Sequence, residues 1–130
     1  MKRILLGFSV LLTIAIVGCS SSGNLVKEEE LGRMTPKKVM ELGAERYSNY
    51  DYDAATYYYL AVTKIFTNDN EEYNEARAWA NYELGYIKYK QQKYDEALKQ
   101  FDEVLKFRLV NNAPLVLATK MKEKLKSVKK

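Results

Sequence analysis

Two segments of this chain repeat each other at a fixed spacing of 42 residues. The segment LGAERYSNYDYDAATYYYLAV (42–62) aligns without a gap with LGYIKYKQQKYDEALKQFDEV (84–104). Eight positions match in this register: Leu42/Leu84, Gly43/Gly85, Tyr47/Tyr89, Tyr52/Tyr94, Asp53/Asp95, Ala55/Ala97, Tyr59/Phe101 and Val62/Val104. Eight matches in one register are improbable by chance, and a repeat of this length indicates helical or mixed units that stack on one another.

Each copy places a glycine in its first predicted helix, and an alanine and an aromatic residue in its second. We expect the glycine and the alanine to let the two helices approach closely, and the ring to fill the space beside them. Together with the leucine before each glycine, these are the predicted packing residues: Leu42, Gly43, Ala55, Tyr59, Leu84, Gly85, Ala97 and Phe101.

This pattern resembles the tetratricopeptide repeat (TPR) family. The resemblance implies an all-α fold, namely a short TPR-like α-α solenoid of two helix-turn-helix repeats (36–110) followed by a C-terminal capping helix. Arg46 and Lys88 stand where the family usually has a tyrosine in the first helix, and the closing proline is absent. The usual repeat has about 34 residues. We assign the excess, FTNDNEEYNEARAWA, to a longer loop and one or two extra N-terminal turns on the third helix.

The hydrophobic pattern predicts repeat helices over 36–49, 53–66, 70–91 and 94–109. NNAP then breaks the pattern, with Asn112 as a cap and Pro114 in the first turn of a fifth helix, 114–128. Two repeats fall short of the three usually needed, so this helix, a partner or self-association must supply the missing contact. We favour the helix, which lies in a basic segment (111–130). Its apolar residues recur at helical spacing, at Leu117, Met121, Leu125 and Val128.

The start of the chain, MKRILLGFSVLLTIAIVGCSSSGN, has a basic beginning and an apolar run that is too short for a membrane span. This predicts a signal peptide over 1–18. Ile16-Val17-Gly18-Cys19 resembles the bacterial lipobox, which implies cleavage before Cys19 and attachment of lipid to its sulfur. The alternative is an ordinary secretory signal with an incidental cysteine. After Cys19, the Ser- and Glu-rich segment 19–35 is predicted to be a lipidated flexible tether.

The composition excludes several functions. The chain has no histidine and one cysteine, which removes Ser-His and Cys-His catalysis, histidine-bound metals and an internal disulfide. No paired acid and base, phosphate-binding loop or nucleophile motif is present, so we expect no enzyme activity, cofactor, metal or small-molecule substrate. Six lysines crowd into 114–130 while the rest of the mature chain is mildly acidic. We interpret this tail as a solvated face, with anionic lipid head groups or an acidic partner as the alternative, and expect no nucleic-acid binding.

The third predicted helix carries two stripes. Ala76, Ala80, Leu84 and Ile87 form a packing face, and Trp79, Tyr82, Tyr86 and Tyr89 form a stripe of aromatic residues. In the TPR register the aromatic stripe lines the concave groove. The matching positions of the first repeat are Lys37, Met40, Ala44, Tyr47 and Ser48. We therefore predict a partner-binding groove that includes Met40 and Tyr47 as well as the four rings. Burial of this stripe by the protein's own C-terminal helix or tether is the alternative.

A lipobox followed by TPR-like repeats resembles the BamD family, the TPR lipoproteins of the outer-membrane β-barrel assembly machinery, although that family has more repeats. The resemblance implies a lipid-anchored adaptor at the cell membrane or outer membrane, facing the periplasm, that binds a protein partner. Ser20 after the cysteine suggests the outer membrane by the enteric sorting rule. Two alternatives remain open: a self-associating scaffolding lipoprotein, and an accessory subunit of an envelope enzyme or transporter.

Overall fold

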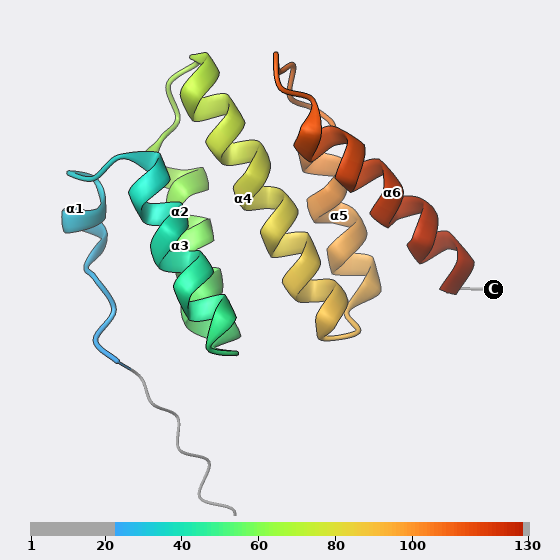
Figure 1. The fold of residues 1–130 in the computed structure, drawn as a ribbon, viewed down its shortest axis with the longest axis horizontal. Helices are drawn as coiled ribbons and strands as arrows, with labels where there is room; N and C mark the ends of the chain where they lie inside the picture. Colours follow the sequence, from blue (N-terminus) through green and yellow to red (C-terminus); the bar gives the residue numbers. More distant parts are fainter. Residues whose placement is uncertain (1–22, 129–130) are drawn as a thin grey trace, which may run out of the picture.

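The computed structural model describes residues 23–128, and the described chain is all-α, as predicted (Figure 1). It contains six helices: α1 (Glu28–Leu31), α2 (Pro36–Ser48), α3 (Tyr52–Ile65), α4 (Glu71–Lys90), α5 (Tyr94–Val104) and α6 (Ala113–Val128). The predicted signal peptide, the predicted lipidation site Cys19 and the last two lysines lie outside the described residues. Within 23–128, no helix is both long and apolar enough to cross a membrane.

The helices form two layers. In Figure 1, α2, α4 and α6 lie side by side in the nearer layer, and α3 and α5 lie behind them. α2 and α3 form one antiparallel hairpin, α4 and α5 form the next, and α6 packs beside α5. One cluster of buried side chains joins α2, α3 and α4, and a second joins α4, α5 and α6. The array is therefore a short stack of helical hairpins, compatible with a repeat solenoid.

The two hairpins have the same turn. Tyr50 and Gln92, which are equivalent at the spacing of 42 residues, both have a φ of 61°, in the left-handed region. The backbone N–H of Asp51 donates to the carbonyl of Arg46 at 3.0 Å, and the equivalent bond of the second turn measures 2.9 Å. The sequence repeat is thus also a repeat of backbone conformation.

The predicted glycine–ring packing is present in both hairpins. A Cβ added to Gly43 would lie 2.6 Å from Cε1 of Tyr59, and one added to Gly85 would lie 2.7 Å from Cε1 of Phe101. All four residues are buried. The space that a side chain would fill at each glycine is therefore occupied by a ring from the partner helix, at equivalent atoms in the two copies.

The segment 23–35 is not the free tether that its composition predicts. Leu31, at the end of α1, is completely buried in the first cluster. The Val26 N–H donates to the hydroxyl of Tyr58 at 3.1 Å, and the hydroxyl of Tyr57 donates to the Val26 carbonyl at 2.8 Å. The segment thus packs against α3 through these bonds and through Leu31. It serves as the N-terminal cap of the stack.

The C-terminal end differs from the prediction in its register. α5 ends at Val104, five residues early, and 105–112 form the connection to α6. α6 starts at Ala113 and buries Pro114, Ala118 and Leu125, whereas Val128 is 49% exposed. The predicted stripe consists of large apolar residues and does not include Ala118. This small buried side chain lets α6 approach α5. The role of α6 as a cover for the second hairpin is as predicted.

Candidate partner-binding groove

The four predicted groove residues of α4 form a continuous row of rings. The centroids of Trp79 and Tyr82 are 5.9 Å apart with an edge-to-face arrangement. Tyr82 and Tyr86 are stacked at 6.3 Å, and Tyr86 and Tyr89 are 5.9 Å apart. All four side chains are half-buried. Because the row is held by ring contacts within one helix, its rings are pre-positioned rather than free to rotate independently.

Half of this row turns toward α5 and α6. The ring of Tyr82 lies 5.7 Å from that of Phe101, and both Tyr82 and Tyr89 pack against the second cluster. The ammonium of Lys124, from α6, lies 4.9 Å from the ring centroid of Tyr89. A hydrogen bond with the Tyr89 hydroxyl raises the pKa of this lysine. For Tyr82 and Tyr89, the alternative therefore holds that the protein's own helices cover the aromatic stripe.

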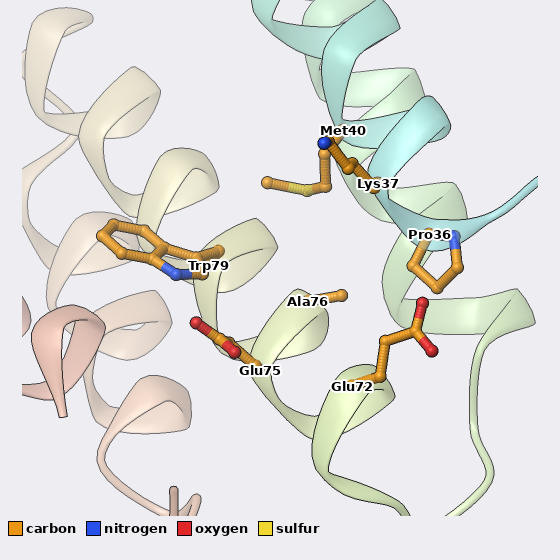
Figure 2. A pocket seen from close by; sticks show the side chains of 7 residues that line it. All are labelled: Pro36, Lys37, Met40, Glu72, Glu75, Ala76 and Trp79. Carbon is orange, nitrogen blue, oxygen red and sulfur yellow. The ribbon is translucent and has the colours of Figure 1, made fainter. Parts of the chain in front are cut away.

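The other half of the row faces α2. Tyr86 contacts Tyr47 at 6.4 Å between centroids, and Tyr47 contacts Tyr52 at 5.4 Å. Toward the N-terminal ends of α2 and α4, a pocket of about 340 Å³ lies between the two helices (Figure 2). Its walls are Pro36, Lys37, Met40, Glu72, Glu75, Ala76 and Trp79. We call this pocket, with Glu83 and the Tyr47–Tyr86 contact that follow it along α4, the α2–α4 groove.

The pocket exists because α4 is longer than its counterpart α2. Pro36, the first residue of α2, is equivalent to Ala78, whereas α4 already begins at Glu71. These additional turns match the predicted N-terminal extension and form one wall of the pocket. The side chain of Asn70 caps the extension by accepting from the Tyr73 N–H at 2.9 Å. The first hairpin has no equivalent wall, so the pocket is specific to the junction of the two repeats.

α2 forms the opposite wall. The hydroxyl of Thr35 accepts a hydrogen bond from the Lys38 N–H at 3.2 Å, and Pro36 occupies the first turn, which fixes where the helix begins. Figure 2 shows Lys37 and Met40 across the pocket from Trp79. Met40 is half-buried against the first cluster. The structure thus brings Met40 and Trp79 together, as predicted for a groove between equivalent helices.

The groove carries more acidic than basic groups. Glu72 and Glu75 line the pocket, with Lys37 as its only cation. Glu83 follows Trp79 by four residues and so lies on the same face of α4. It is half-buried, and this burial raises the pKa of its carboxyl group. Tyr59 and Tyr47, whose own pKa values are raised first by burial, also lie close enough to sense its charge.

The carboxylates were not identified from the sequence. The signal that could have found them is spacing: Glu72, Ala76, Trp79, Glu83 and Tyr86 follow one another at intervals of four and three, the spacing of one helix face. Carboxylates are frequent on solvated helix faces, so their presence in a sequence does not by itself indicate a binding site. The aromatic residues of the same face are the stronger signal. The extension of α4 beyond the end of α2, which brings Glu72 and Glu75 against Pro36, becomes visible only in three dimensions.

Among residues 23–128, no group of three or more acidic, histidine or cysteine side chains is arranged to hold a metal ion. Comparison of the chain with protein-family models, with curated proteins and with solved structures gives no match.

Proposed function

We propose that this protein is a lipid-anchored adaptor of the cell envelope that binds a polypeptide partner in the α2–α4 groove. The observation that carries the proposal is the pocket of about 340 Å³ between Met40 and Trp79. Pockets of this size, lined by apolar groups with a few polar ones, are the usual form of a binding site.

The shape of the groove favours an extended polypeptide over a compact ligand. From Trp79 to Tyr86 the exposed edge of α4 covers seven residues, about 10 Å along the helix. An extended chain rises about 3.3 Å per residue, so this stretch matches roughly three residues of a bound strand. The row of stiff rings offers contact area at little cost in conformational entropy.

The envelope location rests on the sequence around Cys19 and its resemblance to a lipobox. We propose that lipid on this cysteine holds the domain at the cell membrane or outer membrane, and that the partner belongs to outer-membrane protein assembly. Cys19→Ser should leave unprocessed precursor that takes up no labelled fatty acid. Normal labelling of this variant would exclude the anchor.

The binding role is tested by site-specific photo-crosslinking in the cell envelope. A photoreactive residue at Met40, on the wall of the groove, should form one discrete adduct with another protein. The same residue at the exposed Val116 of α6 is the matched control and should not form that adduct. Crosslinking only to a second copy of this chain would favour the scaffolding alternative, and the same adduct from both positions would exclude the groove.

A further inference from the structure

We propose that the α2–α4 groove selects a basic side chain, preferably arginine, carried on an extended apolar segment of the partner. The cation stacks on the indole of Trp79 and is balanced by the carboxylates of α4. This inference rests on the proposed function and specifies the chemistry of the partner.

Charge complementarity determines the choice of occupant. Glu72 and Glu75 line the pocket together with the single ammonium of Lys37, and Glu83 follows farther along the same face of α4. The groove is thus apolar in its walls and negative along one edge. An acidic segment would be repelled, and a neutral one would leave the carboxylates partly desolvated without compensation.

The groove carboxylates are available for a ligand. None of the ion pairs seen among residues 23–128 includes a carboxylate of the groove. One oxygen of Glu75 accepts from the side-chain amide of Asn111 at 2.8 Å, which leaves its second oxygen. The side chains of Glu72 and Glu83 form no hydrogen bond or ion pair with any residue between 23 and 128.

Structural roles account for Glu72 and, through the bond with Asn111, for Glu75, but not for Glu83. Glu72 lies in the first turn of α4, where a negative charge stabilises the helix dipole. Glu83 lies in the thirteenth position of α4, far beyond that first turn. Its neighbours are tyrosines, which supply no positive charge, and burial already disfavours its ionised form. A half-buried carboxylate of this kind destabilises the free protein and is stabilised by an incoming cation.

Trp79 supplies the second half of the site. Tryptophan binds cations over its ring face more strongly than other aromatic residues, and the planar guanidinium of arginine combines this stacking with hydrogen bonds to carboxylates. Two other aromatic rings already hold a cation from this chain: Phe107 holds Arg77 at 5.3 Å, and Tyr89 holds Lys124 at 4.9 Å. Among the described residues, none places a cation on Trp79.

Trp79 is the only tryptophan of the chain, so its fluorescence reports directly on the groove. The purified full-length protein in an uncharged detergent is titrated with a capped hexapeptide of alternating valine and arginine. The matched peptide has citrulline, which keeps the shape of arginine without its charge. We expect the arginine peptide to change the emission of Trp79 and to bind at least about tenfold more tightly than the citrulline peptide. Added salt should reduce this preference.

Variants of the protein give an independent measurement. A triple variant with Glu72→Gln, Glu75→Gln and Glu83→Gln should bind the arginine peptide about tenfold more weakly and the citrulline peptide with unchanged affinity. Lys37→Gln should bind the arginine peptide more tightly. Glu123→Gln, on the exposed face of α6, is the control for net charge and should have no effect. Because the comparison of the two peptides uses the unaltered protein, it remains decisive even if the triple variant fails to fold.

The outcomes separate this inference from the proposed function. Equal binding of the arginine and citrulline peptides would overturn the preference for a cation and leave a neutral peptide groove. No response of Trp79 to either peptide would also overturn this inference, whereas the proposed function would still be decided by the crosslink from Met40. A salt-sensitive dimer that the triple variant abolishes would show that the groove binds the lysine-rich end of a second copy, and would equally overturn the inference.

Discussion

Gly85 of α4 lies so close to the ring of Phe101 of α5 that an added Cβ would be 2.7 Å from Cε1. Phe101 is completely buried, so its ring cannot move aside without displacing the second cluster. The same relationship joins Gly43 to Tyr59 in the first hairpin. The two glycines therefore set the distance between the helices of each hairpin.

Gly85→Ala should destabilise the fold although alanine is the better helix former. The gain in helix propensity is about 1 kcal/mol, and overpacking against a fixed ring costs about 1–3 kcal/mol. We expect a net loss of up to about 2 kcal/mol in urea unfolding. Adding Phe101→Leu should reduce the penalty of the alanine, because the smaller side chain frees the space. Gly32→Ala, where the nearest atom would be 3.5 Å away, is the control and should be neutral or stabilising.

The shared left-handed turn predicts a stabilising substitution. Tyr50 has a φ of 61° and is 80% exposed. Its backbone is therefore strained, and its side chain gains little stabilisation from packing. Tyr50→Gly should stabilise the protein by up to about 1 kcal/mol after allowing for the greater entropy of the unfolded chain. Tyr50→Val should destabilise it, since a branched residue tolerates this conformation poorly. Thermal unfolding distinguishes the two, and equal melting temperatures would contradict the turn geometry.

The docking of 23–35 predicts a local effect of removing one hydroxyl group. Tyr58→Phe leaves the Val26 N–H without its acceptor and should cost about 1 kcal/mol. Amide exchange at Val26 and proteolysis within 23–35 should both accelerate, because the segment is held by few contacts. Tyr50→Phe, which alters an exposed ring, should change neither. Unchanged exchange in Tyr58→Phe would mean that the segment is a tether after all.

The sequence contains enough information to place the hairpins, because their packing depends on residues that recur at one spacing. Gly85 and Phe101 could be paired from the alignment alone. The docked segment could not be found in this way. Its apolar residues Val26 and Leu31 stand among charges without helical spacing, and the hydroxyls that hold Val26 come from residues more than 30 positions away.

The groove was predictable in part. The alignment brings Met40 and Trp79 to neighbouring helices, and both line the pocket. The division of the aromatic row could not be read from spacing, since Trp79, Tyr82, Tyr86 and Tyr89 lie along a helix that has neighbours on both sides. Which ring turns to α2 and which to α5 and α6 depends on where those helices cross α4, and the sequence does not specify those positions.

The divided row predicts that neighbouring rings have different roles. Tyr82→Ala removes the contact with Phe101 and should lower the free energy of unfolding by about 2 kcal/mol. Trp79 lines an open pocket, so Trp79→Ala should lower the free energy of unfolding by less than about 1 kcal/mol. The same substitution should weaken partner binding at least about tenfold. Urea unfolding and crosslinking yield from Met40 measure the two effects. Equal losses of stability would contradict the division.

The buried charge of Glu83 predicts a specific dependence of stability on pH. Burial raises the pKa of this carboxyl above its ordinary value of 4.5. At pH values between 4.5 and the raised pKa, the folded protein therefore binds more protons than the unfolded chain. Stability from this group is therefore fully present below about pH 4 and is lost as the pH rises through the raised pKa. Glu83→Gln removes the ionisation. It should raise the melting temperature at pH 7, and this gain should shrink toward pH 4.

The groups facing Glu83 are Tyr47 of α2, Tyr59 of α3 and Tyr82 of α4, none of which titrates in this range. The effect therefore belongs to Glu83 itself, and the exposed Glu123→Gln should show no comparable gain at pH 7. Adding the arginine peptide should stabilise the unaltered protein at pH 7 more than at pH 4, because only the ionised carboxylates attract it. A gain for Glu83→Gln that is the same at both pH values would show that the carboxyl is not desolvated, and a loss at pH 7 would show that its charge stabilises the fold.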